Sequence, residues 1–195
     1  MTATLPEAEV AKTLREVAHE LPVPDQYRVE IIEGAIVMSP TPSGMHGRML
    51  WRLAEMLLEK LPEGYEIENN LGVDKAPDSD DYCVPDLFVA PRHVLETWET
   101  EVPPMEVIFV AEVVSRSSQA HDRVSKRKVY AEAGIPLYLL IDPLEARLAL
   151  FYQPVRGAYR GEHTVPWGDK IQLPEPLPAL VDSSRFPSLE GRPRP

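Results

Sequence analysis

Two acidic residues stand in apolar segments, where a carboxylate needs a partner. Asp86 follows a proline near the start of the segment CVPDLFVA, and Glu112 interrupts the apolar run from Val107 to Val114. Burying a carboxylate costs free energy unless a cation or a metal ion neutralises it. Two carboxylates on neighbouring strands could hold Mg²⁺, a hard cation that accepts one or two carboxylates together with waters and phosphate oxygens.

Each of these carboxylates also has a simpler interpretation. An acid at the end of a buried strand can form a structural ion pair with a lysine, and this alternative stays open for Glu112. An aspartate after a proline at a strand start is commonly a turn or capping residue, so Asp86 alone indicates little. The metal-site hypothesis therefore depends on the two residues together.

A helix is predicted over residues 120–133, after the second carboxylate. Asp122, Lys126 and Tyr130 recur every four residues, so they share one face of this helix. Lys126 lies beside the inward-facing stripe, where it could take part in catalysis. The alternative is an ion pair with Asp122 in which the lysine stem is covered and the ammonium reaches solvent.

The same helix carries the best local basic patch of the chain. Arg123, Arg127 and Lys128 are the predicted nucleic-acid-binding residues, although a solvated basic face is the more common role of such a run. The formal net charge of −11 argues against a nucleic-acid binder, because phosphate affinity comes mainly from Lys and Arg. An acidic chain can still bind through a local basic patch or around a bound metal ion.

Composition limits the class of protein. The 195 residues suit one domain with terminal additions, and 44% hydrophobic with 26% charged residues is ordinary for a globular protein. The one cysteine, Cys83, allows no disulfide within the chain and fits a reducing compartment. Residues 1–20 do not resemble a signal peptide and no segment is apolar enough to span a membrane, so we expect a cytoplasmic protein without a membrane partner. Zinc-binding, Walker, Rossmann and serine-hydrolase motifs are absent from the sequence.

Several predicted elements would position the acidic residues. A hairpin is predicted over residues 27–38, with Glu33 and Gly34 at its turn. The strand, helix and strand between residues 106 and 142 form a crossover, which makes the two strands parallel. These elements predict an α/β (α+β) fold with a mixed sheet flanked by helices. Further helices are predicted over residues 5–21 and 45–60, and strands over 64–74, 83–90, 103–114, 137–142, 147–153 and 158–165.

Four stretches of the chain, between residues 27 and 152, match one family. They are YRVEIIEGAIVMSPTP with a histidine downstream, VPDLFVA, VAEVVSRSS, and DRVSKRKVYAEAGIPLYLLIDP. Their order and spacing resemble the Uma-two family, a bacterial group described as restriction endonucleases of the PD-(D/E)XK superfamily. The resemblance implies a restriction-endonuclease-like sheet and a nuclease-like domain over residues 25–185. Residues 1–24 would be a helical extension, and residues 186–195 would be a disordered tail.

The resemblance implies a divalent-metal site. It places the first acidic ligand of the superfamily on Asp86 and the acid of the (D/E)XK element on Glu112. With the backbone carbonyl of Val113, these residues would hold Mg²⁺ or Mn²⁺, which activates a water molecule and stabilises charge on the scissile phosphate.

The lysine of the (D/E)XK element has no equivalent at its usual position. It would fall on Val114, and a valine cannot orient a water molecule. The resemblance suggests that Lys126 takes this role, and that it either orients the water or stabilises charge on the phosphate. Glu30 and His46 occupy positions typical of the family. Glu30 could bind a second metal or order Lys126, and His46 could contact phosphate, although spacing alone favours an exposed strand residue and a structural or capping histidine.

The resulting hypothesis is an endonuclease that hydrolyses phosphodiester bonds of nucleic acid, with DNA favoured over RNA. A twofold homodimer is plausible, because cutting both strands of a duplex commonly needs two sites. Two alternatives stay open. One is a catalytically degenerate nuclease fold that binds or regulates, and the other is an interaction protein in which Glu112 and Lys126 form a purely structural pair.

Overall fold

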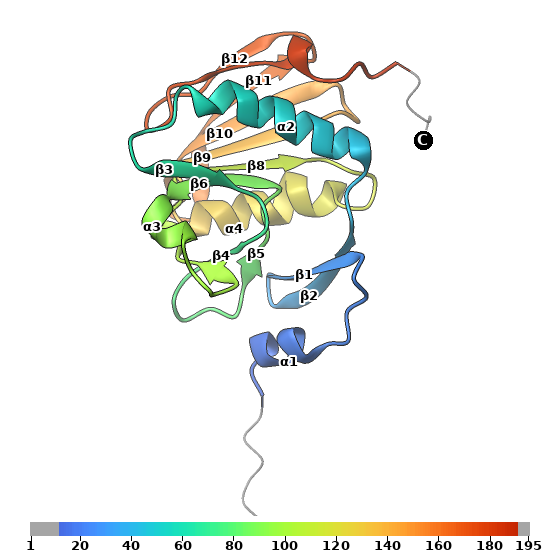
Figure 1. Ribbon diagram of the computed structural model, residues 1–195, viewed down its shortest axis with the longest axis vertical. Helices are drawn as coiled ribbons and strands as arrows, with labels where there is room; N and C mark the ends of the chain where they lie inside the picture. Colours follow the sequence, from blue (N-terminus) through green and yellow to red (C-terminus); the bar gives the residue numbers. More distant parts are fainter. Residues whose placement is uncertain (1–11, 191–195) are drawn as a thin grey trace, which may run out of the picture.

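Three sheets organise the chain, as seen in the computed structural model, which describes residues 12–190 (Figure 1). The six-stranded sheet has the order β11-β10-β9-β8-β6-β3, and a five-stranded sheet has the order β2-β1-β5-β4-β7. A third sheet pairs β12 with β13. Helix α1 and strand β12 lie at opposite ends of the molecule (Figure 1).

The bounds of the elements follow in chain order. The larger sheet contains β3 (Tyr65–Glu68), β6 (Leu87–Pro91), β8 (Phe109–Val113), β9 (Leu137–Asp142), β10 (Arg147–Val155) and β11 (Ala158–Pro166). The five-stranded sheet contains β1 (Tyr27–Ile32), β2 (Ala35–Pro40), β4 (Gly72–Asp74), β5 (Tyr82–Cys83) and β7 (Glu101–Val102), and the third contains β12 (Lys170–Gln172) and β13 (Leu180–Asp182). The α-helices are α1 (Leu14–Glu20), α2 (Gly44–Leu58), α3 (Arg92–Leu95) and α4 (Lys126–Glu132). Short 3₁₀ turns cover Pro104–Glu106 and Ser183–Arg185, and a π-helical turn covers His121–Ser125.

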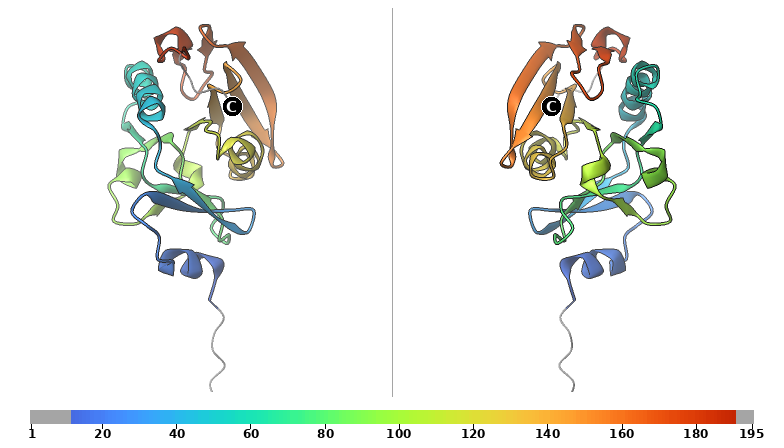
Figure 2. Two further views of the ribbon diagram at one scale, coloured as in Figure 1. Left: turned by 90° about the vertical axis from the view of Figure 1, so that its right-hand side faces the viewer. Right: turned by 90° about the vertical axis from the view of Figure 1, so that its left-hand side faces the viewer.

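Alternating side chains give the central strands two apolar faces. On β9, Leu139 faces a cluster that contains Leu53 of α2, whereas Tyr138 and Leu140 face a cluster that contains Tyr130 of α4. The two helices therefore cover different faces of the six-stranded sheet, as the side views also indicate (Figure 2). Such coverage explains why the sequences of β8 and β9 are almost continuously apolar.

The predicted crossover is confirmed. Strands β8 and β9 are parallel, with Phe109 opposite Leu137 and Glu112 opposite Leu140, and α4 lies between them in the chain. Gly134 follows the helix with a φ of 77°, a conformation that glycine adopts without a steric penalty. Strand β6 pairs antiparallel with β8 on the other side, so the sheet is mixed, as predicted.

The predicted hairpin is also confirmed. Strands β1 and β2 pair antiparallel in the register Tyr27↔Pro40 to Ile32↔Ala35. Glu33 and Gly34 connect them with φ values of 52° and 74°. Positive φ at both turn residues matches the twist of the flanking strands, so this turn directs the two strands into one ribbon.

Three predicted strands are wrong in extent. The strand over 64–74 is divided between β3 and β4, which belong to different sheets, because the chain bends where Glu68 accepts hydrogen bonds from the backbone of Asn69 and Asn70. The strand over 83–90 is divided between β5 and β6 around Pro85, which has no N–H to continue a ladder. The segment 103–114 begins with a 3₁₀ turn at its two prolines, and only its second half is the strand β8.

The ends of the chain add contacts to the fold. The predicted helix over 5–21 is described only from residue 12, and α1 packs Ala18 against Ile31 and Tyr82. Phe186, in the segment predicted as a tail, is buried in the cluster under α2, whereas residues 191–195 lie outside the described residues. No helix within residues 12–190 has the length and apolar character needed to cross a membrane.

Helix α2 offers a test of the core. Replacing Leu53 by alanine should lower the free energy of unfolding by about 2–5 kcal/mol, because this fully buried side chain fills space between α2 and the sheet. Leu58 is the matched control, since it lies in the same helix with 60% of its surface exposed. Its alanine variant should change stability by less than about 0.5 kcal/mol in urea denaturation. Equal losses in the two variants would contradict the buried face described for α2.

Candidate active site

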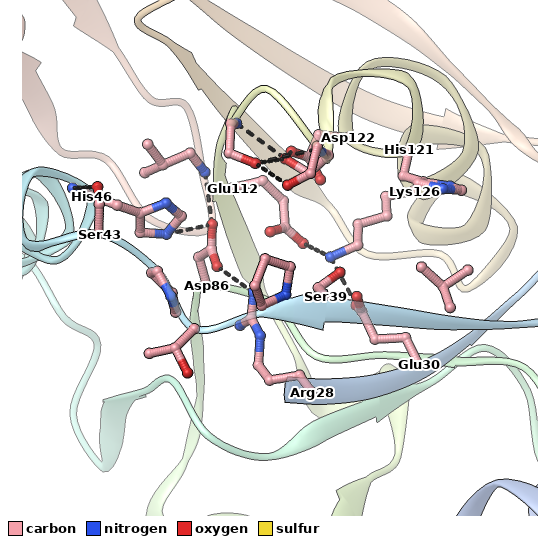
Figure 3. A pocket seen from close by; sticks show the side chains of 18 residues that line it. Arg28, Glu30, Ser39, Ser43, His46, Asp86, Glu112, His121, Asp122 and Lys126 are labelled. Carbon is pink, nitrogen blue, oxygen red and sulfur yellow. Dashed lines mark hydrogen bonds and ion pairs between the residues drawn. The ribbon is translucent and has the colours of Figure 1, made fainter. Parts of the chain in front are cut away.

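A cavity of about 130 Å³ opens where the hairpin, α2, β6, β8 and the start of α4 meet (Figure 3). Its charged lining comes from Arg28 and Glu30 on β1, Asp86 directly before β6, Glu112 on β8, and Asp122 and Lys126 at the beginning of the α4 region. His46, in the first turn of α2, and His121 complete the titratable residues that line it. The cavity therefore joins residues from both larger sheets.

Asp86 is buried and has partners at both carboxylate oxygens. Its side chain is 3% exposed, and Oδ1 accepts a hydrogen bond of 3.0 Å from Arg28 Nη2. Oδ2 accepts a hydrogen bond of 2.9 Å from the backbone N–H of Val113 and lies 2.9 Å from His46 Nε2. Burial by itself would raise the pKa of Asp86, but the adjacent His46 and the charge of Arg28 outweigh burial and hold this pKa below its ordinary value.

Lys126 is the centre of a second buried cluster. Its Nζ lies 2.9 Å from Glu112 Oε1 and 2.8 Å from Glu30 Oε1, and its side chain is 4% exposed. Tyr130 donates a hydrogen bond of 2.5 Å to the same Glu112 oxygen, and Glu30 Oε1 also accepts from the backbone N–H of Val84. Figure 3 shows Lys126 between the two glutamates.

The neighbouring carboxylates keep Lys126 protonated. Burial would lower the pKa of Lys126, but Glu112 and Glu30 outweigh burial and raise it, so the lysine keeps its charge. Burial raises the pKa of Glu112, and Lys126 opposes this only in part because Asp86 and other acids lie nearby. Lys126 therefore acts as a hydrogen-bond donor and a positive charge in this cavity rather than as a base.

Asp122 is a further buried carboxylate of the cavity. It is 2% exposed, it accepts a hydrogen bond from Ser118, and Ser118 contacts Ser115 at 2.9 Å. Burial raises the pKa of Asp122 to about 6, although Lys126 opposes the shift. Asp122 lies in the π-helical turn before α4, and such turns are frequent at functional sites.

The donor set fits a hard divalent cation. Four buried carboxylates, from Glu30, Asp86, Glu112 and Asp122, face the cavity, while its fully charged cations are Arg28 and Lys126. Oxygen ligands and a surplus of negative charge suit Mg²⁺ or Mn²⁺. Within residues 12–190, no three His, Cys, Asp or Glu side chains already surround one point as a preformed metal site. The carboxylates would have to leave their present cationic partners to share an ion.

The structure brings the predicted catalytic residues together, and Val113 lines the same cavity. Glu30 is 1% exposed, so the exposed strand residue favoured by spacing alone is wrong, because the second face of the hairpin is covered. The alternative of an Asp122–Lys126 pair at the surface is also wrong, since Lys126 is buried between two glutamates. Val114, at the expected position of the (D/E)XK lysine, packs with Val129 in the apolar cluster below α4. The catalytic roles themselves stay predictions.

The predicted nucleic-acid-binding residues do not line the cavity. Arg123 forms ion pairs with Asp142 and Glu145, and Lys128 pairs with Glu33. The guanidinium of Arg127 lies over the Phe151 ring, 5.0 Å from its centroid. Arg123 and Lys128 are therefore paired with acidic side chains, whereas Arg127 contacts an aromatic ring.

Sequence reasoning missed Arg28 and gave Asp122 no role in a site. A signal for Arg28 was present, because Arg28 and Glu30 are two residues apart on a strand and therefore share one face. No comparable signal existed for Ser118, whose contribution depends on the loop after β8.

The fold and the site together define the class of this protein. It is an α/β protein with a mixed sheet, and a cavity lined by buried carboxylates and a lysine lies at the end of the central strands. The family model Uma2, described as "Putative restriction endonuclease", matches residues 15–185, so the chain belongs to this family. A crystal structure from Anabaena variabilis ATCC 29413, described as "a putative nuclease belonging to DUF820", matches with a TM-score of 0.65 and 19% identity. The match covers 88% of this chain and 96% of the other, and it shows the fold. No curated protein matches the chain.

The buried lysine can be tested against an exposed one on the same helix. Lys126→Met should lower the free energy of unfolding by about 3–5 kcal/mol, because Glu30 and Glu112 would then face each other without a cation. Lys128→Met should cause no measurable loss, since the Lys128–Glu33 pair is exposed to solvent. Urea denaturation at neutral pH measures both. A similar loss from the two variants would show that Lys126 is not the buried counterion described above.

Asp122 predicts a pH dependence of stability. Between its ordinary pKa of 3.8 and its folded pKa of about 6, the unfolded chain has released the proton that the folded protein still binds. Stability contributed by this group is therefore lost as the pH rises through that interval. Asp122→Asn removes the effect, so its stability relative to the wild type should increase by about 2–3 kcal/mol across the interval. A constant difference between the two proteins in urea denaturation would contradict the raised pKa.

Proposed function

We propose that this protein is a divalent-metal-dependent nuclease that hydrolyses phosphodiester bonds of nucleic acid, with DNA as the favoured substrate. One observation carries the proposal: four buried carboxylates and a charged lysine share one small cavity. A fold has little reason to bury this surplus of negative charge for stability, because each unpaired carboxylate is destabilising. A divalent cation would offset it.

Asp86, Glu112 and the carbonyl of Val113 would hold Mg²⁺ or Mn²⁺. Such an ion supplies activation of a water molecule and neutralisation of charge on the scissile phosphate. Asp86 is fixed for this purpose by the backbone N–H of Val113, and Glu112 by the Tyr130 hydroxyl. These hydrogen bonds hold Asp86, directly before β6, and Glu112, near the end of β8, in place.

Lys126 would stabilise negative charge on the phosphate. Its raised pKa keeps it protonated, and its position between Glu112 and Glu30 orders its side chain. Glu30 would act as a positioning residue for Lys126, or as a ligand of a second metal ion. His46 reaches the cavity from the first turn of α2 and would contact phosphate. The arrangement resembles a phosphate site in which charge stabilisation supplies most of the catalysis.

The comparisons support a nuclease in general terms. The family to which the chain belongs is described as "Putative restriction endonuclease", and the Anabaena protein with the same fold is described as "a putative nuclease". Metal dependence, DNA as substrate, a cytoplasmic location and a homodimer are parts of this proposal. The amphipathic helix α1 or the proline-rich C-terminal region could form the dimer contact.

A second candidate is a catalytically degenerate fold that binds or regulates. The observation that favours it is the closed pairing of Lys126 with Glu112 and Glu30, which satisfies the lysine without a metal ion. Val114 at the usual lysine position and the net charge of −11 agree with it. This candidate predicts a folded protein that neither binds Mn²⁺ nor cleaves nucleic acid.

A metal titration and a cleavage assay separate the two candidates. Mn²⁺ should raise the melting temperature of the wild type, because it binds the folded state alone, and Glu112→Gln should lose this rise. Asp86→Asn and Glu112→Gln should each lower metal-dependent cleavage of DNA by at least about a hundredfold. Glu33→Gln is the control, since Glu33 lies in the hairpin turn outside the cavity, and it should keep full activity. Undiminished cleavage by a pure Asp86→Asn, Glu112→Gln double variant would overturn the site assignment.

A further inference from the structure

Arg28 occupies an unusual position in the cavity. It donates from Nη2 to Asp86 Oδ1, and its Nε is a buried donor that finds no hydrogen-bond partner among residues 12–190. Arginine in a purely structural pair commonly engages a carboxylate through both nitrogens of one edge, whereas here one carboxylate oxygen receives a single bond. The orphaned Nε is therefore a donor that an additional anion in the cavity would satisfy.

Arg28 also has more freedom than the other buried cation. Its side chain is 27% exposed, whereas that of Lys126 is 4% exposed and fixed by two glutamates. Its planar fork of donors matches the geometry of a phosphate, and Nε belongs to that fork. Figure 3 shows Arg28 extending from β1 to Asp86 below the cavity.

The present contact of Arg28 competes with a metal ion for Asp86. The guanidinium of Arg28 contacts one oxygen of this carboxylate, His46 Nε2 lies 2.9 Å from the other, and the backbone N–H of Val113 uses a further acceptor position. A divalent cation at Asp86 would lie beside the positive charge of Arg28 and be repelled by it. The contact should therefore weaken metal binding as long as Arg28 stays in place.

We infer that Arg28 is a further phosphate-binding residue of this site, beside Lys126 and His46, and that it holds Asp86 until it binds a nucleic-acid phosphate instead. This inference rests on the proposed nuclease function and deepens it. An incoming phosphate accepts hydrogen bonds from Nε and from the Nη that releases Asp86, and the freed carboxylate then becomes available to the metal ion. Metal and nucleic acid thereby strengthen each other's binding, and thermodynamic linkage requires this effect to be reciprocal.

The test measures Mn²⁺ affinity by calorimetry, alone and with a phosphorothioate DNA oligonucleotide that resists cleavage. Arg28→Met should bind Mn²⁺ alone about tenfold more tightly than the wild type, a change typical of such coupling. The oligonucleotide should raise the Mn²⁺ affinity of the wild type but not that of Arg28→Met. Arg15→Met is the matched control, because Arg15 forms a half-buried pair of 2.8 Å with Asp74 outside the cavity. It should behave as the wild type does.

Arg28→Lys is a second variant, which tests the role of Arg28 even if Arg28→Met fails to fold. It keeps a positive charge near Asp86 but lacks the fork, so its Mn²⁺ affinity without DNA should match the wild type. The enhancement by the oligonucleotide should be reduced in this variant. Retention of the full enhancement would overturn the role of Arg28 as a phosphate ligand.

Failure of this inference differs from failure of the proposed function. If Glu112→Gln abolishes Mn²⁺ binding while Arg28→Met binds Mn²⁺ no more tightly than the wild type, Arg28 is a structural counterion and the metal site stands. If neither the wild type nor Arg28→Met binds Mn²⁺, with or without the oligonucleotide, both the metal site and the role of Arg28 are overturned.

Discussion

The buried contact of Lys126 with Glu112 and Glu30 is the interaction on which the site depends. A charged group inside a protein is tolerated only with close partners, so the three elements that carry these residues must meet at one place. Lys126 and Tyr130 of α4 reach Glu112 of β8, and Glu30 of β1 reaches Lys126 from the other sheet. The hydrogen bond from Tyr130 to Glu112 adds a third contact from the same helix. The positions of α4 and of the hairpin are thereby linked to the chemistry of the cavity.

The cavity contains more buried carboxylates than fully charged cations, four against two. Asp86 lies beside Arg28 and His46, and Glu112 shares Lys126 with Glu30, whereas Asp122 accepts a hydrogen bond from the neutral hydroxyl of Ser118. Burial raises the pKa of Asp122 to about 6, and the charge of Lys126 and the hydrogen bond from Ser118 offset this only in part. A protein that only needed a stable core could replace these groups by apolar side chains at little cost. The surplus is understandable if a divalent ion belongs to the working state.

The net charge of −11 is compatible with a phosphate-binding site, because the two cations assigned to phosphate, Arg28 and Lys126, lie inside the cavity. Surface residues Arg123 and Lys128 are engaged with acids of their own neighbourhood. Nucleic acid would therefore be bound through a metal ion and Arg28 rather than through an extended basic surface. Binding of this kind makes affinity depend on the metal ion and less on the number of neutralised phosphates.

The sequence by itself determined the hairpin over 27–38, the parallel crossover through residues 106–142, and Glu112 as a residue that needs a partner. It offered Asp86 and Lys126 as candidates for the same site. These features depend on local pattern: a glycine turn, apolar periodicity, and acids in apolar segments. The tertiary structure decided where segments 64–74 and 83–90 divide between sheets, and which residues surround the acids. Arg28 meets Asp86 across 58 positions of the chain. Such contacts depend on how strands pair over long separations, and no local signal in a single sequence specifies that pairing.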